Sequence, residues 1–268
     1  MHRRRRFCVL TIAGSDSGAG AGIQADSRTI GAFGGHALTA ITAITAQNTT
    51  GVLAWWAVPP DLIRLQIEAV LADFSVKAVK TGLLPGPEAI LAVVAALKSH
   101  ANLPLVVDPV IASTSGTRFL SGAGLRALRL KLLPRAALVT PNLPEAEALT
   151  GVRIRSSADV ERAALRLLET GCGAVLVKGG HGRGATCRDC LMTSAGLLHW
   201  FESPRIATRN THGTGCVLSA AIAAALAAGV PLPHAVDGAR RFLLLCLKSS
   251  RSLRWGKGKG PAFVPPAP

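Results

Sequence analysis

Tyrosine is absent from this 268-residue sequence, and aromatic residues together make up only 4% of it. Acidic residues are also scarce, since 15 Asp and Glu face 30 Lys and Arg and leave a formal net charge of +15. This excess is compatible with a polyanionic partner or with nothing more than an Arg-rich composition. Beyond residues 3–6 the basic residues are scattered, and no aromatic side chains alternate with them. The sequence therefore predicts no nucleic-acid partner.

Long hydrophobic runs are missing as well. The best candidate for a membrane span, residues 220–229, has only the length of a core helix. The apolar run at residues 7–13 follows four arginines, but it is too short for a secretion signal and lacks an A-x-A cleavage site. We therefore expect a soluble, cytoplasmic protein without a membrane partner, whose residues 1–6 form a disordered basic N-terminus.

The six cysteines do not form the pattern of a disulfide framework, because the chain is long and 49% hydrophobic. Cys8, Cys172 and Cys246 fall in apolar patterns, where a thiol is usually a small hydrophobic side chain. Cys187 and Cys190 form a C-x-x-C pair, but no second pair or nearby His completes a zinc site. We interpret this pair as incidental rather than as a metal or redox site.

Short β-branched segments alternate with helical patterns along the chain. This alternation predicts a three-layer α/β/α fold, with a mostly parallel central sheet and helices on both faces. Two further strands around a turn predict an antiparallel edge. We expect one domain over residues 7–261 and a Pro-rich C-terminal tail at 262–268. The expected strands are 7–13, 37–45, 76–80, 105–107, 138–140, 174–177, 185–192 and 197–202, and the expected helices are 61–73, 87–100, 145–150, 157–170 and 219–229.

Polar residues follow several of these strands, at the sheet edge where ligands of parallel α/β sheets bind. The turn AGSDSGAGAGIQAD at residues 13–26 fits neither the dinucleotide-binding motif nor the P-loop. It indicates either a tight turn or backbone close to a small ligand, with Asp26 as a polar handle one turn into a helix. A second strand ends in ITAQN, where Gln47 suits an aminopyrimidine edge but is also an ordinary strand terminator.

Carboxylates follow two other strands. Asp108 ends an apolar run in VVDPV, and Glu145 lies near Asn142 in TPNLPEAE. Carboxylates from separate strands can converge on one Mg²⁺ ion and its waters, as phosphoryl transfer requires. Glu145 also has a plainer interpretation, because an acid in the first turn of a helix is favoured by the helix dipole.

The last two motifs predict an anion site. Lys178 ends a strand in LVKGGHG, where it can hold a phosphate as a point charge. The motif NTHGTGC at residues 210–216 opens an apolar helix. The backbone N–H groups of Gly213, Gly215 and Cys216 would therefore face an anion, and the helix dipole would add positive charge. This is the strongest local signal in the sequence.

These motifs, with TAQNTTGV and WGKGKGP, occur in an order and spacing that resemble the bacterial hydroxymethylpyrimidine/phosphomethylpyrimidine kinases of thiamine biosynthesis. The resemblance covers about residues 7–261. It implies a ribokinase-like fold, ATP and Mg²⁺ as cofactors, and a pyrimidine and its monophosphate as successive small-molecule substrates. It also implies a homodimer.

The resemblance implies roles for individual residues. Cys216 matches the family's catalytic position, and we hypothesise that it accepts the proton of the substrate hydroxyl. A helix N-terminus lowers a thiol pKa of ~8.5 by only about one unit, but a loose transition state needs only a modest base. The alternative is a small residue that packs the helix start. The remaining residues are Gln47, Asp26, Gly14 and Leu83 on the substrate side, Lys178, Thr208 and Asn142 on the nucleotide side, and Asp108 and Glu145 at the metal.

Two alternative functions stay open. A pyridoxal or pyridoxine kinase would act on a substrate of similar size, and Gln47 does not decide between the two kinases. A non-catalytic pyrimidine-binding protein would retain the fold, but the presence of Asp108, Glu145 and Cys216 favours an enzyme. The chain departs from the family pattern at Ala19, which replaces a glycine and requires a negative or mildly strained φ. Leu83 stands where a Met is common.

Overall fold

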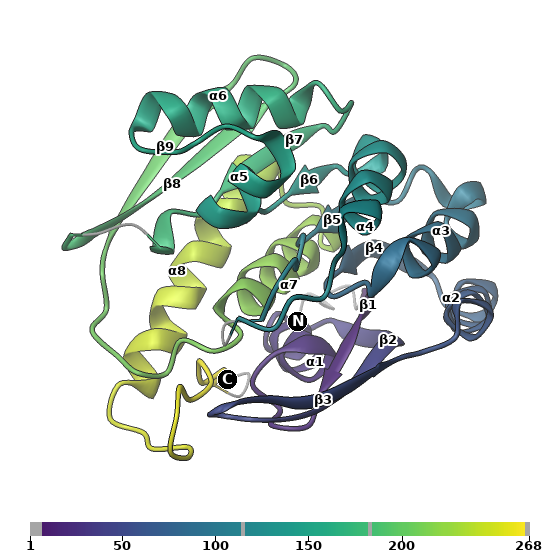
Figure 1. Cartoon of the computed structure of the whole chain (residues 1–268), viewed down its shortest axis with the longest axis horizontal. Coiled ribbons are helices and arrows are strands. Elements are labelled where there is room, and N and C mark those ends of the chain that lie inside the picture. Colours follow the sequence, from purple (N-terminus) through teal and green to yellow (C-terminus); the bar gives the residue numbers. More distant parts are fainter. Residues whose placement is uncertain (1–6, 114–115, 182–183, 266–268) are drawn as a thin grey trace, which may run out of the picture.

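The computed structural model describes residues 7–113, 116–181 and 184–265, so the expected N-terminal segment 1–6 lies outside it. Over the described residues, one sheet has the strand order β3-β2-β1-β4-β5-β6-β7-β8-β9 (Figure 1). The strands from β2 to β7 pair in parallel, and β3, β8 and β9 add antiparallel pairs at the two edges. The strands are β1 Cys8–Asp16, β2 His36–Asn48, β3 Gly51–Ala57, β4 Val76–Thr81, β5 Leu105–Val107, β6 Leu138–Val139, β7 Ala174–Val177, β8 Thr186–Thr193 and β9 Leu198–Pro204.

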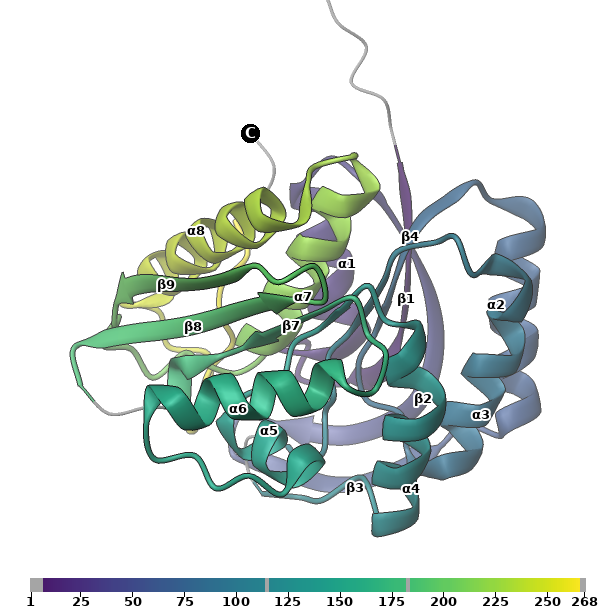
Figure 2. The ribbon, with the colours of Figure 1, turned by 90° about the horizontal axis from the view of Figure 1, so that it is seen from above.

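Helices cover both faces of the sheet, which confirms the predicted three-layer α/β/α architecture. Figure 2 shows α1, α7 and α8 on one face and α2 to α6 on the other. The sheet supplies a core to each face because successive side chains of a strand point in opposite directions, as with Val9 and Leu10 of β1. The helices are α1 Gly22–Ala32, α2 Pro60–Asp73, α3 Gly86–Ala96, α4 Gly122–Ala127, α5 Leu143–Thr150, α6 Ser157–Leu168, α7 Thr214–Ala227 and α8 Leu232–Ser250.

The α7 helix is buried on all sides. Residues 217–225 are all buried, and the helix lies between α1 and α8 against the sheet (Figure 2). Its sequence is rich in alanine, which has the highest helix propensity and lets neighbouring backbones approach closely. A helix that is apolar all round belongs in the interior, and this position fixes the place of its N-terminus.

The structure adds elements that the sequence pattern does not predict. Strand β3 forms a hairpin with β2, so both edges of the sheet are antiparallel rather than one. The long helix α8 packs against α7. Charged residues interrupt the apolar pattern of this segment, so the sequence pattern does not predict the helix. Within the described residues, no helix is long and apolar enough to cross a membrane.

The C-terminal segment is packed rather than frayed at its start. Ala262 and Val264 are buried against Val217 of α7 and Cys246 of α8. The N–H of Ala262 donates to the backbone oxygen of His212 at 3.0 Å. The expected tail from residue 262 is therefore part of the fold as far as Val264, while residues 266–268 lie outside the described part of the chain.

Candidate active site

A cleft of about 500 Å³ runs along the carboxyl ends of the parallel strands. This is where a parallel α/β sheet binds its ligands. Ten of the residues predicted from the sequence line it: Gly14, Gln47, Leu83, Asp108, Asn142, Glu145, Lys178, Gly213, Gly215 and Cys216. Residues more than 200 positions apart in the sequence thus share one cavity.

One end of the cleft combines an apolar wall with an amide. Leu83 packs with Ala43 and Phe119, and Gln47 lies at the end of β2 beside them. A Cβ atom on Gly14 would come within 2.9 Å of Leu83 Cδ2, so a larger residue here would displace the Leu83 side chain. This end is suited to a flat ring with polar atoms at its edge.

The turn between β1 and α1 is organised by Asp16. Its Oδ1 accepts from Gly18 N at 2.8 Å, and its Oδ2 accepts from Gly20 N at 3.0 Å and Ala21 N at 2.8 Å. Burial opposes ionisation of Asp16, but the hydrogen bond from His212 and these N–H groups outweigh it and lower its pKa. Ala19 has φ 55°, a left-handed value that is strained for alanine.

The N-terminus of α7 faces the cleft. Gly213 caps the helix with φ 78°, and a Cβ atom there would lie only 1.8 Å from Gly20 O. A Cβ atom on Gly215 would lie 3.2 Å from Lys178 Nζ and 3.3 Å from Asp108 Oδ2. Glycine is therefore required at 213 for α7 to approach the β1–α1 turn, whereas a side chain at 215 would only press on the charged pair. The N–H groups of a first helical turn lack partners within the helix, so this N-terminus is suited to an anion.

The pKa values of the two predicted metal ligands shift in opposite directions. Burial by itself would raise the pKa of Asp108. The positive charges of Lys178, whose Nζ lies 2.8 Å from Asp108 Oδ1, and of Lys80 outweigh this effect and lower the pKa. Glu145 forms a capping box with Asn142, but burial raises its pKa to about 7. Among the described residues, no group of three His, Cys, Asp or Glu side chains could hold a metal ion. A buried carboxylate poised near neutrality beside a second one fits Mg²⁺, which keeps only one or two protein carboxylates and binds phosphate oxygens.

Asp26 does not line the cleft, although the sequence predicts it beside the substrate. It is fully buried and accepts from Lys80 Nζ at 2.8 and 3.0 Å and from Thr11 Oγ1 at 2.5 Å. Burial disfavours the charged form of Lys80, but Asp26 outweighs it and raises the pKa of Lys80. The Gly-rich motif pointed to Asp26 as a functional residue, but no sequence pattern pointed to Lys80. This lysine lies on β4, 54 residues along the chain from Asp26.

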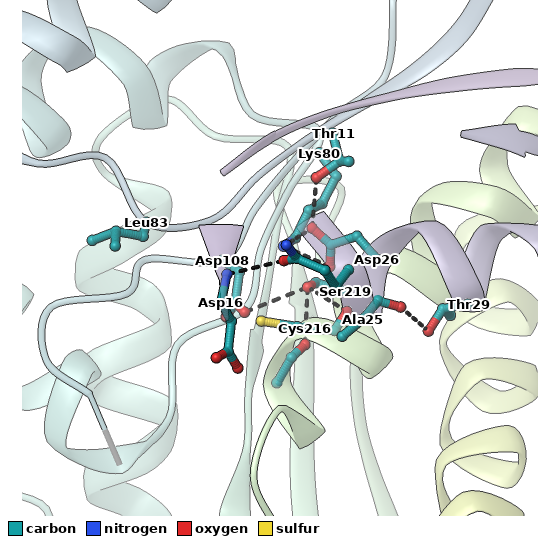
Figure 3. Close-up of polar contacts among 12 residues, drawn as sticks. Thr11, Asp16, Ala25, Asp26, Thr29, Lys80, Leu83, Asp108, Cys216 and Ser219 are labelled. Atoms are coloured by element: carbon teal, nitrogen blue, oxygen red, sulfur yellow. Dashed lines mark hydrogen bonds and ion pairs between the residues drawn. The ribbon is translucent and has the colours of Figure 1, made fainter. Parts of the chain in front are cut away.

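Cys216 lies near this buried ion pair, as Figure 3 shows. Burial raises the pKa of its thiol to about 12, although the charge of Lys80 opposes the shift. Desolvation of the thiol therefore exceeds the lowering of about one pKa unit that a helix N-terminus can supply. At neutral pH the resting side chain is a thiol.

The other end of the cleft lies between β8, β9 and α8. Asp189 accepts from Arg240 Nε at 2.6 Å and from Gly179 N at 2.8 Å, which ties the turn after β7 to α8.

Thr208 accepts from Asn210 N but does not line the cleft, contrary to its predicted place on the nucleotide side. Cys187 lines the cleft, whereas Cys190 is buried in the core beneath α6, because residues three apart on a strand face opposite sides.

Comparison with known proteins agrees with this geometry. The family described as phosphomethylpyrimidine kinase matches residues 16–263, which is nearly the whole chain. The chain belongs to the phosphomethylpyrimidine kinase family.

Relatives of known name support this assignment. A hydroxymethylpyrimidine/phosphomethylpyrimidine kinase of Rhizobium meliloti is 47% identical over 94% of this chain and 95% of its own length. A thiamine biosynthesis bifunctional protein of Geobacter sulfurreducens is 44% identical over 96% of this chain, which spans only 52% of that longer protein.

Solved structures of phosphomethylpyrimidine kinase and of a second kinase share the fold. A phosphomethylpyrimidine kinase from Clostridium difficile is 40% identical with a TM-score of 0.79, over 90% of this chain and 99% of that one. A Bacillus subtilis pyridoxal kinase in an ADP complex is 32% identical with a TM-score of 0.88, over 96% and 97% of the two chains. These neighbours agree with the predicted ribokinase-like fold, in which both kinds of kinase occur.

Proposed function

We propose that the protein transfers a phosphoryl group from ATP to 4-amino-5-hydroxymethyl-2-methylpyrimidine, and then phosphorylates the monophosphate to the diphosphate, in thiamine biosynthesis. The observation that carries this proposal is the meeting of two different half-sites at one helix N-terminus. A ring-binding end at Gln47 and Leu83 and a phosphate-binding end at Lys178 both open onto the start of α7. The names of the relatives support the same reaction.

Each half-site has a role in this reaction. Gln47 binds the polar edge of the pyrimidine, while Leu83 and Gly14 hold its ring and hydroxymethyl group. Lys178 and Asn142 lie on the nucleotide side of the cleft. The backbone N–H groups of Gly213, Gly215 and Cys216 stabilise the transferring phosphoryl group, and Cys216 accepts the hydroxyl proton.

The proposal includes Mg²⁺ as a cofactor held by Asp108 and Glu145. A bound divalent cation would neutralise charge on the triphosphate. The raised pKa of Glu145 supports this assignment, because an adjacent cation would favour the ionised form that burial disfavours. Asp108 is kept ionised by Lys178 before any ion binds.

A coupled ADP-release assay tests the reaction. We expect Mg²⁺-dependent turnover with the hydroxymethylpyrimidine and with its monophosphate, because one cleft serves both steps. The monophosphate separates the double kinase from an enzyme that phosphorylates only the alcohol. Absence of turnover with both substrates, in protein that binds ATP, would contradict the proposal.

Pyridoxal kinase is the second candidate function. The structural likeness to the Bacillus subtilis pyridoxal kinase favours including it, since that protein is 32% identical over 96% of this chain. Pyridoxal therefore belongs in the same assay as a third substrate. Turnover of pyridoxal that exceeds turnover of the pyrimidine would establish this alternative.

We also propose a cytoplasmic homodimer. All six cysteines are free, which suits a reducing compartment. Ile44 of β2 lies opposite Trp56 of β3, and these side chains are 57% and 70% exposed on one hairpin. Exposed apolar side chains that cluster in this way are typical of protein interfaces.

The hairpin gives a direct test of the dimer. We expect the wild-type protein to have the mass of a dimer by light scattering and Trp56→Glu to have the mass of a monomer, because a charge would be buried in the interface. Leu91→Glu is the matched control, since Leu91 is 48% exposed on α3 and away from the hairpin. A dimer that survives Trp56→Glu would place the interface elsewhere.

A further inference from the structure

His212 connects the β1–α1 turn with the ring-binding end of the cleft. Its Nε2 lies 2.8 Å from Asp16 Oδ2 and 2.9 Å from Gln47 Nε2. All three residues line the cleft. His212 directly precedes Gly213, yet neither the sequence motif nor the proposed reaction gives its imidazole a role.

The imidazole is held in one place by three parts of the chain. His212 N donates to Gly260 O at 3.0 Å, and His212 O accepts from Ala262 N at 3.0 Å. A Cβ atom on Gly20 would lie 2.3 Å from His212 Cδ2, so the ring packs directly on the β1–α1 turn. The C-terminal segment, the turn and the start of α7 therefore fix the direction of Nε2.

The hydrogen-bonding groups decide which atom of Gln47 faces His212. Asp16 is ionised, because its pKa is lowered, and a carboxylate only accepts hydrogen bonds. His212 Nε2 must then carry a proton. The Gln47 atom at 2.9 Å is drawn as Nε2, which would set an N–H₂ donor against the N–H of His212. Rotation of the amide exchanges its nitrogen and oxygen, so we assign the oxygen to this position, where it shares the single Nε2 proton with Asp16 Oδ2.

The backbone of Gln47 is fixed separately. Ser17 Oγ accepts from Gln47 N at 2.8 Å and donates to Gln47 O at 2.8 Å. Rotation of the side-chain amide is therefore the freedom that His212 removes. With the oxygen directed to His212, the two N–H groups of the amide are left for a ligand.

We propose that His212, oriented by Asp16, is a positioning residue that holds the Gln47 amide with its N–H donors toward the substrate. The site then selects rings with a hydrogen-bond acceptor at that edge, such as a ring nitrogen of an aminopyrimidine. This inference rests on the proposed function, because it assumes that the ring binds beside Gln47. It attributes selectivity for the substrate ring to the hydrogen-bonded Asp16, His212 and Gln47 together rather than to Gln47 alone.

Binding without ATP tests the inference apart from catalysis. Calorimetry would compare the hydroxymethylpyrimidine with two analogues, each with one ring nitrogen replaced by C–H. The wild-type protein should disfavour one analogue by about tenfold, since a buried donor left without a partner costs about 1–3 kcal/mol. His212→Leu should reduce this preference to less than about threefold, because the amide can rotate to suit either ring.

Matched variants complete the test. His212→Gln should keep the preference, because its amide N–H₂ can donate to both Asp16 and Gln47 at similar reach. In a Gln47→Leu background, His212→Leu should change the preference no further. If His212→Leu does not fold, the retained preference of His212→Gln carries the test by itself.

The contrary outcomes are distinguishable. A preference unchanged by His212→Leu, or lost in folded His212→Gln, would overturn the inference and leave the proposed function intact. Failure of the wild-type protein to bind the parent pyrimidine would instead overturn the proposed function, and the inference with it.

Discussion

Replacing Cys216 with alanine is expected to lower kcat by about 10² or more, as for the loss of a positioned proton acceptor. ATP affinity should change little, because Lys178 and the backbone of the glycine-rich turn stay in place. The coupled ADP-release assay gives kcat, and calorimetry gives the ATP dissociation constant. Cys216→Ser is the matched control, since a hydroxyl of similar size titrates above the thiol and should be equally inactive.

The pH profile separates proton acceptance from packing. Burial raises the pKa of Cys216 to about 12, so the thiolate form is rare at neutral pH and grows about tenfold per pH unit below that value. If the thiolate accepts the proton, wild-type kcat should rise with pH until another step limits the rate. Cys216→Ala should lose this slope. An unchanged kcat, or a flat wild-type profile, would leave Cys216 as a residue that packs the helix start.

Lys80→Met is expected to lower the free energy of unfolding by about 3–5 kcal/mol, because it leaves the carboxylate of Asp26 buried without its charged partner. Both side chains are 0% exposed, so water cannot replace the lost ion pair. Denaturant unfolding measures the change. The double variant Lys80→Met/Asp26→Leu should recover part of the loss, since it removes both charges from the interior.

An exposed ion pair supplies the comparison for Lys80. Arg64 and Glu68 lie one turn apart on α2 with side chains 42% and 44% exposed. Arg64→Met should therefore change the unfolding free energy by less than about 1 kcal/mol, as for other surface pairs. If Lys80→Met costs no more than Arg64→Met, the buried pair contributes no more than a surface pair.

The Lys80–Asp26 ion pair could not be predicted from the sequence. A positive residue on a buried strand carries no motif, and its partner is set by how α1 packs against β1 and β4. The burial of Asp26 behind the cleft wall was not predicted for the same reason, because local sequence does not say which side of a helix faces a cleft. Strand β3 was missed since its apolar residues lie on an exposed hairpin and not in the core pattern.

The sequence by itself determined the α/β alternation and most of the strands and helices in order, and its motifs carried the resemblance to the family. Local patterns suffice for the strands and helices, because hydrophobic period, glycine position and capping are short-range properties. Only the tertiary structure decided the burial of the Cys216 thiol, the pairing of Asp26 with Lys80, and the contact of His212 with Gln47 across 165 residues. Desolvation and long-range hydrogen bonds depend on which segments meet, and that is settled only when the whole chain packs.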